Sequence, residues 1–292
     1  MKQTAINGET TLYGVLGTPI KHSKSPAIYN RGFERDQINS VYLAFDVSKD
    51  NTQGKIGMLK QLGVKGMNLT MPCKHEAIVC ADDLDEAASL VQAVNTLVLE
   101  EGRWKGYNTD GIGFWSAVKA KGYHLAEEKV LLFGSGSTAA IILVQAVLEG
   151  VQEIVVFARQ LERPLVIKAL IDKLTAAYAV QIELVDLSNR QLLERALLSS
   201  DIVVQATSVG MDPESQRTIL PEGVVFKAGA LVCDCVYQPL RTEFLRSAEA
   251  QGCETLHGLH MLVGQAVENY RLFTGLELDA GALLGELLEE GE

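Results

Sequence analysis

The sequence predicts an α/β protein made of two domains. Short β-rich runs alternate with longer helical periods, a pattern typical of a mostly parallel sheet with helices on both faces. The chain has 292 residues, and we expect two domains from a mixed α/β chain of that length. Apolar residues make up 47 % of the chain, which is enough to bury a substantial core.

The first series of elements begins with a strand and ends with a helix. We expect strands at 11–17, 41–47 and 64–70, and helices at 26–36, 51–62 and 111–122. Pro26 suits the first turn of the first helix, and Ser25 is expected to be its N-cap. Residues 89–108 have the pattern of a helix end followed by a β-hairpin, with Glu101 and Gly102 as its turn.

A second series of strands and helices follows. We expect strands at 129–136, 153–159, 181–187, 201–207 and 230–237, and helices at 137–149, 164–178 and through 259–290. No internal repeat, low-complexity segment or proline-rich linker interrupts the series. The domain boundaries therefore have to come from the positions of functional motifs.

Charge and apolar patterning exclude several classes of partner. The net charge is −11 and the Lys and Arg residues are scattered, so we expect no nucleic-acid partner. The first ten residues are polar, and the most apolar stretch, 139–148, is shorter than the roughly 20 residues that span a bilayer. We therefore expect a cytoplasmic protein that does not interact with a membrane.

The five cysteines do not have the spacing of a metal site. Cys233 and Cys235 form C-x-C rather than C-x-x-C, and no second cysteine pair lies nearby in the sequence. His257 and His260 are three residues apart, but no carboxylate or cysteine pattern accompanies them. We expect no bound metal, and we expect the cysteines to be reduced thiols.

The segment FGSGSTAA indicates a dinucleotide-binding turn. Gly134, Gly136 and Ala139 form G-x-G-x-x-A between a predicted strand and a predicted helix. The first glycine permits a tight turn, the second admits a pyrophosphate, and the alanine allows close helix–strand packing. Ser137 and Thr138 begin the helix, whose free N–H groups favour an anion. The alternative is a tight βα turn that binds nothing.

The end of the next strand indicates which dinucleotide binds. An NAD site usually has an acidic residue here, which accepts a hydrogen bond from the ribose 2′-hydroxyl. This sequence has Ala158 and Arg159, and a guanidinium group suits the 2′-phosphate of NADP. NADP is therefore expected. NAD stays open, because Arg163 would add a positive charge that favours the 2′-phosphate of NADP, whereas Glu162 adds a negative charge that does not.

Polar clusters occur where predicted strands of the first series end. They are HSKSP at 22–26, NLTMPCK at 68–74, VNT at 94–96 and YNTDG at 107–111. In open α/β sheets ligands bind at strand ends. Hydroxyl, amide, amino and carboxylate groups together suit a small polyhydroxylated acid.

These ordered motifs resemble the shikimate dehydrogenase family, which includes quinate/shikimate dehydrogenases. The likeness covers nearly the whole chain and extends to GLHMLVGQA at 258–266. It implies an N-terminal α/β substrate domain, 1–110 plus 258–292, and a Rossmann-like NADP-binding domain, 111–257, with a cleft between them. It also implies reversible hydride transfer between shikimate and 3-dehydroshikimate in aromatic amino-acid biosynthesis.

The resemblance assigns roles to residues of this sequence. Lys74 and Asp110 would be the catalytic pair, and Ser23 and Ser25 would bind the substrate carboxylate. The remaining substrate contacts would come from Asn68, Thr70, Asn95, Tyr237 and Gln265. The cofactor contacts would come from Gly134, Gly136, Ser137, Thr138, Ala139, Arg159 and Gly258.

Three departures from the family pattern lie on the cofactor side. The glycine loop is GSGST where the family commonly has GAGGA, the strand end is A-R-Q instead of N-R-T, and His260 replaces a glycine. A quinate or aminoshikimate dehydrogenase using NAD or NADP therefore stays open, as does a non-catalytic sensor. The proton could be taken by neutral Lys74 or by the Lys74–Asp110 pair, since desolvation lowers a lysine pKa and a carboxylate raises it. The oligomeric state also stays open, a homodimer included.

Overall fold

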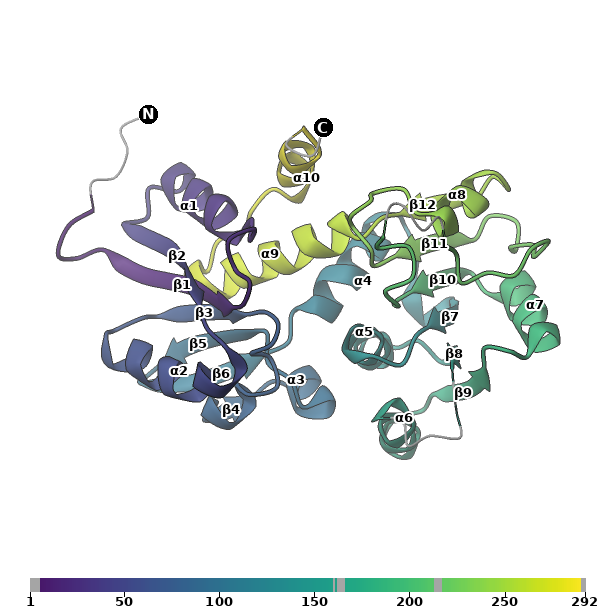
Figure 1. The fold of residues 1–292 in the computed structure, drawn as a ribbon, viewed down its shortest axis with the longest axis horizontal. Coiled ribbons are helices and arrows are strands. Elements are labelled where there is room, and N and C mark those ends of the chain that lie inside the picture. Colours follow the sequence, from purple (N-terminus) through teal and green to yellow (C-terminus); the bar gives the residue numbers. More distant parts are fainter. Residues whose placement is uncertain (1–5, 160, 162–165, 213–216, 290–292) are drawn as a thin grey trace. The chain divides into compact units, whose positions relative to one another are not determined.

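The computed structural model describes residues 6–159, 161, 166–212 and 217–289. It divides the chain into two compact units, each of which mixes helices and strands. The first unit is Met1–Thr109 together with Gln265–Glu292, and the second unit is Asp110–Gly264. The α/β fold predicted from strand–helix alternation is confirmed, and Figure 1 shows the elements along the chain.

The first unit contains a mixed six-stranded sheet in the order β2-β1-β3-β5-β6-β4. Its strands are β1 (Thr11–Gly17), β2 (Ser40–Asp46), β3 (Gly66–Leu69), β4 (Asp83–Leu84), β5 (Thr96–Glu100) and β6 (Arg103–Tyr107). The strands β1, β2 and β3 are parallel, whereas β5 is antiparallel to both β3 and β6. Glu101 and Gly102 have positive φ and form the tight turn of the predicted hairpin.

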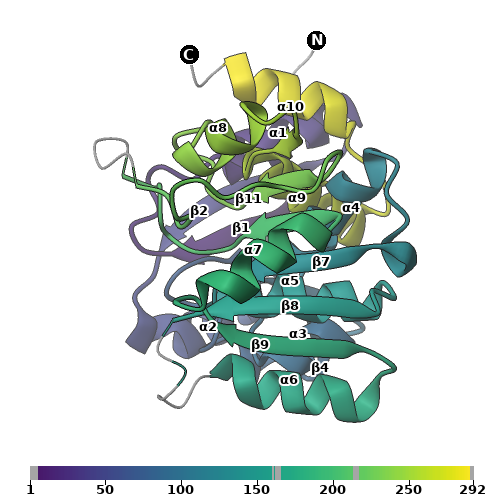
Figure 2. The ribbon, with the colours of Figure 1, turned by 90° about the vertical axis from the view of Figure 1, so that its right-hand side faces the viewer.

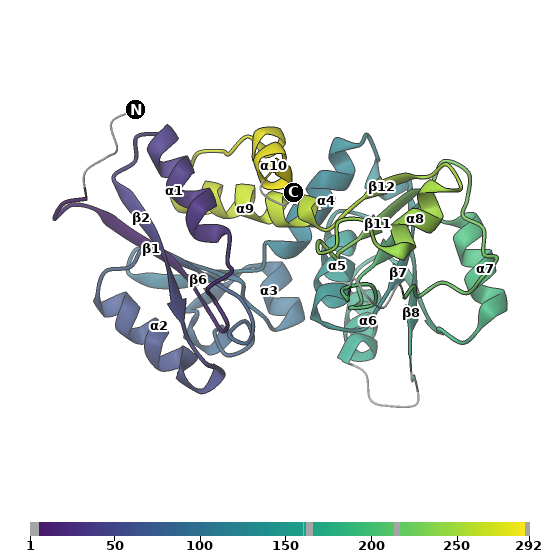
Figure 3. The same ribbon diagram turned by 45° about the horizontal axis from the view of Figure 1, so that its top comes forward.

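Helices cover both faces of this first sheet. They are α1 (Ser25–Arg35), α2 (Thr52–Gln61), α3 (Glu86–Val91), α9 (Leu259–Thr274) and α10 (Ala280–Glu289). Aromatic rings join α1 and α9 to one face: Phe273 packs against Tyr13 with ring centroids 5.0 Å apart. On the other face, Ile56 and Leu59 of α2 pack in a second core with Trp104. Figure 3 shows α1 beside β2.

The second unit contains a fully parallel six-stranded sheet in the order β12-β11-β10-β7-β8-β9. Its strands are β7 (Lys129–Phe133), β8 (Glu153–Ala158), β9 (Gln181–Asp186), β10 (Ile202–Gln205), β11 (Leu231–Asp234) and β12 (Glu254–Leu256). The chain runs outward from β7 to β9 and then returns to the other side of β7. This reversal is the doubly wound topology of a dinucleotide-binding sheet.

Helices also cover both faces of the second sheet. They are α4 (Asp110–Ala120), α5 (Ser137–Leu148), α6 (Val166–Ala177), α7 (Arg190–Ser199) and α8 (Glu243–Glu249). Leu193 of α7 and Phe244 of α8 pack on one face against Phe133 and Phe157. The helix α5 contacts α4 and α6, and Figure 2 shows α5 behind the strands and α7 in front of them.

The structure corrects three details of the predicted elements. Ser25 is the first residue of α1 and not its cap, because Lys24 already has helical backbone angles and gives no side-chain cap bond. The helical end is two helices, α9 and α10, because Gly275 adopts a φ of 74° that ends the first of them. The short helices α7 and α8 were not predicted.

Candidate active site

Four strand ends meet at one edge of the first sheet. The strands β1 and β3 are parallel, so their carboxyl ends share an edge. Because β5 is antiparallel to β3, its amino end lies at the same edge, and the carboxyl end of β6 lies there too. The four polar clusters found in the sequence therefore gather at this edge.

Backbone hydrogen bonds join the end of β1, which leads to the first cluster, to the second cluster. The Thr18 N–H donates to Met71 O at 3.0 Å, and the Thr70 N–H donates to Leu16 O at 2.9 Å. A Cβ atom at Gly17 would overlap the Thr70 methyl group, so the close approach requires glycine. The segment that leads from β1 to Ser23, and on to Ser25 at the start of α1, is thus held at its beginning beside the loop that carries Lys74.

The backbone of Lys74 is anchored on both sides. The Cys73 N–H donates to Thr70 O at 2.7 Å, and the buried Cys73 Sγ lies 3.1 Å from Thr52 Oγ1. The Val94 N–H donates to Lys74 O at 3.0 Å, which joins this loop to the third cluster. The Lys74 residue is half-buried, so its amino group begins from a fixed backbone position.

A buried hydrogen-bond network links four of the predicted substrate residues: Ser25, Asn68, Asn95 and Gln265. Ser25 contacts the Tyr42 hydroxyl, which donates to Asn68 Oδ1 at 2.6 Å. Asn68 Nδ2 donates to Thr96 Oγ1 at 3.0 Å. Burial raises the pKa of Tyr42, so the hydroxyl keeps its proton and remains a donor.

The network continues into the helix α9. Thr96 Oγ1 donates to Asn269 Oδ1 at 2.6 Å, and Asn269 Nδ2 donates to Gln265 Oε1 at 2.8 Å. Asn95 Nδ2 donates to Thr109 Oγ1 at 3.0 Å, and the Thr109 N–H donates to Asn95 Oδ1 at 2.9 Å. Satisfied networks of this kind fix side-chain orientation. They leave each amide only part of its hydrogen-bonding capacity for a ligand.

Sequence reasoning did not single out four members of the network: Tyr42, Thr96, Thr109 and Asn269. Thr96 and Thr109 lie inside motifs that were recognised, so the signal was present but was not assigned to them. Asn269 lies one helical turn after Gln265, a spacing that places both on one face of α9. Tyr42 has no sequence signal, because a tyrosine in a strand is ordinary.

Asp110 directly follows Thr109 and is the first residue of α4. The next residue, Gly111, packs against α5, where a Cβ atom would lie 2.6 Å from Gln145 Cβ and 2.9 Å from Ile141 O. Asp110 therefore lies between the Asn95-bound Thr109 and a tightly packed helix start. Its main-chain position is fixed within the second unit.

The predicted glycine turn has the geometry of an anion site. Gly134 has a φ of 129°, and a Cβ atom there would lie 2.8 Å from Ala206 O. Gly136 is the N-cap of α5 with extended backbone, and a Cβ atom there would meet nothing within 4 Å. Ser137 and Thr138 are at least partly exposed in a first turn without acidic residues. Free N–H groups at such a helix start attract a phosphate.

Arg159 lies one strand away from the glycine turn. It directly follows β8, whose Phe157 pairs in register with Phe133 at the end of β7. The arginine is exposed, so its guanidinium group is accessible to a ligand. Glu162 and Arg163 lie outside the described residues. The glycine turn and Arg159 together fit the pyrophosphate and 2′-phosphate of NADP.

The remaining predicted residues follow β11 and β12. Tyr237 is 52 % exposed, which is unusual for a large aromatic ring and leaves its face available. Gly258 has a packing role, because a Cβ atom there would overlap the carbonyl of Cys235. His260 packs against His257 in a tilted arrangement, with ring centroids 4.3 Å apart and the ring planes at 50°. Burial, and to a smaller extent the neighbouring His260 ring, lowers the pKa of His257 to about 4. The His257 ring is therefore neutral at pH 7.

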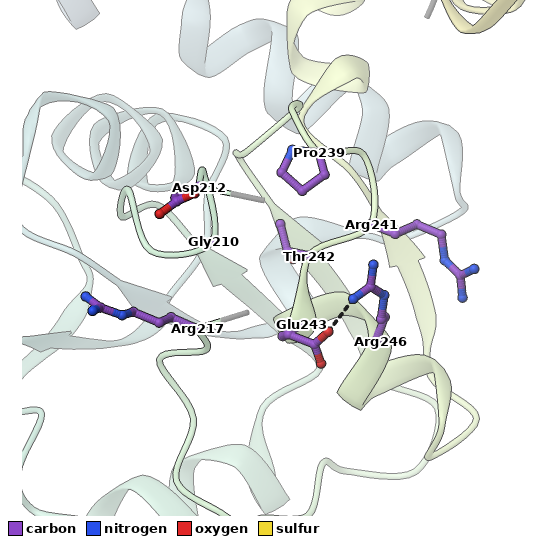
Figure 4. Close-up of a pocket in the computed structure, with 8 residues that line it drawn as sticks. All are labelled: Gly210, Asp212, Arg217, Pro239, Arg241, Thr242, Glu243 and Arg246. Atoms are coloured by element: carbon purple, nitrogen blue, oxygen red, sulfur yellow. Dashed lines mark hydrogen bonds and ion pairs between the residues drawn. The ribbon is translucent and has the colours of Figure 1, made fainter. Parts of the chain in front are cut away.

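A pocket of the second unit does not include the predicted site residues among the described residues that line it. Figure 4 shows these: Gly210, Asp212, Arg217, Pro239, Arg241, Thr242, Glu243 and Arg246. Arg246 pairs with Glu243, and Arg241 pairs with Glu249, so much of the arginine charge is compensated.

Metal-binding clusters and membrane-spanning helices are both absent from the described part of the chain. Within it, no three His, Cys, Asp or Glu side chains gather in a way that could hold a metal ion. Within the same ranges, no helix combines the length and the apolar character needed to cross a membrane.

Comparisons with known proteins point to one family. The family model described as the shikimate dehydrogenase substrate binding domain matches residues 15–97. A protein of Streptococcus suis named shikimate dehydrogenase (NADP(+)) is 36 % identical over 288 residues, which cover 98 % of each chain.

Solved structures agree with this result. The shikimate 5-dehydrogenase of Listeria monocytogenes, solved with shikimate and NAD, has a TM-score of 0.91 and 34 % identity, covering 97 % of this chain and 98 % of that one. The quinate dehydrogenase of Corynebacterium glutamicum, solved with NAD, has a TM-score of 0.83 and 30 % identity, covering 96 % and 99 %.

Proposed function

Because the chain belongs to the shikimate dehydrogenase family, we propose that it catalyses the reversible, NADP-dependent oxidation of shikimate to 3-dehydroshikimate. The observation that carries this proposal is the likeness over the full length to an enzyme named for this reaction. The polar network at one edge of the first sheet supports the same substrate class, since it presents hydroxyl and amide groups from separate strands.

The first unit is proposed to bind the substrate. The match of the substrate-binding family model to residues 15–97 supports this division, because that range lies within the first unit. Ser23 and Ser25 would bind the carboxylate. Asn68, Thr70, Asn95 and Gln265 would contact the ring hydroxyls, with Tyr237 of the second unit as a further contact. Of these, Asn68 and Asn95 are oriented by buried partners.

The catalytic step would be a paired hydride and proton transfer. A dinucleotide held by the second unit would supply the acceptor for the hydride that leaves the carbinol carbon. As the C–H bond breaks, the hydroxyl oxygen forms the ketone and releases its proton, which Lys74 and Asp110 are proposed to accept. The reverse reaction returns the proton to the ketone oxygen as hydride arrives. The fixed backbone of Lys74 supports this role, because proton transfer needs a positioned base.

The second unit is proposed to bind NADP. The glycine turn after β7 fits the pyrophosphate, and Arg159 after β8 fits the 2′-phosphate. Ala139 is fully buried and allows α5 to approach the sheet, while Gly258 supports the loop after β11. These features of the fold favour the dinucleotide over an empty turn.

Quinate oxidation with NAD is the second candidate. It is favoured by the structural likeness to a quinate dehydrogenase solved with NAD and by the A-R-Q sequence at the end of β8. Quinate carries an additional tertiary hydroxyl beside its carboxylate, so the space around Ser23 and Ser25 would decide between the two substrates. The cytoplasmic location and the homodimer remain predictions.

Initial rates at 340 nm test the proposed function. Shikimate and quinate are each combined with NADP and with NAD, at several concentrations. We expect the highest kcat/KM for shikimate with NADP. A higher value for quinate with NAD would replace the proposal by the second candidate. Absence of turnover with all four pairs, in a protein that melts cooperatively, would favour a non-catalytic sensor.

Arg159→Ala is expected to change the cofactor preference. Loss of the charge-assisted bonds to the 2′-phosphate should raise KM for NADP by about 10- to 100-fold and leave KM for NAD within about twofold. Arg195→Ala, which removes an exposed arginine of α7, is the matched control. Equal changes for both cofactors would mean that Arg159 does not contact the 2′-phosphate.

A further inference from the structure

A buried polar cluster lies at the carboxyl ends of β10 and β11 in the second unit. Its members are Gln205, Asp234 and Thr242, which are respectively 0 %, 1 % and 2 % exposed. None of them was among the residues predicted to touch substrate or cofactor. A buried carboxylate and a buried amide need a specific explanation, because apolar side chains usually fill such positions.

The two carboxylate oxygens of Asp234 accept hydrogen bonds from three donors. Oδ1 accepts from the Val236 N–H at 2.9 Å and from Gln205 Nε2 at 3.2 Å, and Oδ2 accepts from Thr242 Oγ1 at 2.6 Å. Burial raises the pKa of Asp234 to about 6, so the group is mostly ionised at pH 7. The described groups that act on its pKa are neutral donors and include no Lys or Arg. A carboxylate held in this way does not favour stability over an apolar residue.

Gln205 holds the loop that follows its own strand. Its Oε1 accepts from the Thr207 N–H at 2.6 Å and from Thr207 Oγ1 at 2.5 Å. Its Nε2 donates to Val209 O at 2.9 Å. A Cβ atom at Gly210 would lie 3.3 Å from Thr242 Cγ2, so Thr242 also packs on this loop. The proximity of Gly210 and Thr242 is visible in Figure 4.

One cluster therefore fixes two loops, 206–210 after β10 and 235–242 after β11. In the sheet order, β10 and β11 form the half opposite to β8, which carries Arg159. A dinucleotide lies across both halves at the carboxyl edge, with one mononucleotide on each. If Arg159 binds the adenosine phosphate, the nicotinamide half faces the two loops held by the cluster.

We propose that Asp234 and Gln205 are positioning residues that hold the loops 206–210 and 235–242 in the conformation that binds the nicotinamide half of the dinucleotide. This inference rests on the proposed function, since it takes a nicotinamide dinucleotide as the ligand. The positioning role explains why a carboxylate is buried here. A charged acceptor holds several donors in one arrangement, which an apolar side chain cannot do.

The test compares Asp234→Ala, Asp234→Asn and Gln205→Met with the wild-type protein. Asn keeps the shape and the Oδ1 acceptor, whereas Ala releases the Val236 N–H, the Gln205 amide and the Thr242 hydroxyl. Ser200→Ala is the matched control, because Ser200 is a fully buried polar residue next to the other end of β10 and its Oγ has no hydrogen-bond partner among the described residues. The readouts are Kd for NADPH by fluorescence, KM for shikimate, and hydrogen exchange of the amides in both loops.

We expect Asp234→Ala and Gln205→Met to raise Kd for NADPH by about tenfold and to speed amide exchange in both loops. Asp234→Asn should restore most of the affinity. KM for shikimate should rise together with Kd for NADPH in Asp234→Ala, because the loop 235–242 also carries Tyr237, and it should stay within about twofold in Ser200→Ala. Unchanged Kd and unchanged exchange would overturn the inference alone. A wild-type protein that does not bind NADPH would instead overturn the proposed function, and the inference with it. If Asp234→Ala does not fold, Gln205→Met decides by the same readouts.

Discussion

Replacing Lys74 by methionine is expected to lower kcat for shikimate oxidation by about three orders of magnitude. General acid–base catalysis contributes roughly 10²- to 10⁴-fold, and no proton acceptor remains at this position in the variant. Methionine keeps an unbranched side chain of similar reach, and the backbone bonds of residue 74 do not involve the amino group. The melting temperature and Kd for NADPH should therefore stay close to the wild-type values.

Lys55→Met is the matched control for this experiment. Lys55 is an exposed lysine of α2 in the same unit, so its loss removes one charge without touching the site. Its kcat should remain within about twofold of wild type. If Lys74→Met retained more than about a tenth of the activity, Lys74 would be only a binding contact and another group would move the proton.

The fold could be predicted from the sequence where the hydrophobic periodicity of a segment coincides with turn residues at its ends. Strand–helix alternation predicted a mostly parallel sheet with helices on both faces, and Glu101-Gly102 predicted the hairpin, since these signals are local. The first sheet is mixed because this hairpin adds β5 antiparallel to both β3 and β6. The cap at Ser25 was wrong because the chain before it already turns with helical angles at Lys24. The helices α7 and α8 were missed although Asn189 and Thr242 cap them, because both are short and follow polar segments.

The candidate site could be predicted only in part. Strand-end clusters are visible in a sequence because each one is continuous. Their convergence depends on the antiparallel pairing of β5 and β6. The only sequence signal for that pairing is the hairpin turn at Glu101-Gly102. The hydrogen bond between Thr96 and Asn269 joins residues that are 173 positions apart, and no local sequence pattern predicts such a pair. The Gln205–Asp234 contact across β10 and β11 escaped prediction for the same reason.

Gly136→Asp is expected to separate the stability of the fold from cofactor binding. Gly136 is the N-cap of α5, with a φ of −84° and a ψ of −175°, and a side chain starting there would enter open space. Aspartate is among the best N-cap residues and suits the positive end of a helix dipole. The melting temperature should therefore stay the same or rise.

The same substitution should abolish NADPH binding. The new carboxylate would occupy the N–H groups of the first turn and repel the pyrophosphate, which we expect to weaken binding by at least about 100-fold. Fluorescence titration with NADPH and thermal melts measure the two effects on one sample. Gly136→Asn caps the helix without a charge, so its affinity should lie between those of wild type and Gly136→Asp.

Gly136 can separate the two effects, whereas Gly134 cannot. At Gly134, any side chain would meet Ala206 O and would have to adopt a φ of 129°, so lost binding there would follow from a damaged fold. At Gly136 the fold accepts a side chain, and only a ligand has reason to exclude one. If Gly136→Asp turned over shikimate with NADP at the wild-type rate and KM, the glycine motif would be a tight βα turn and the dinucleotide would have to bind elsewhere in the second unit.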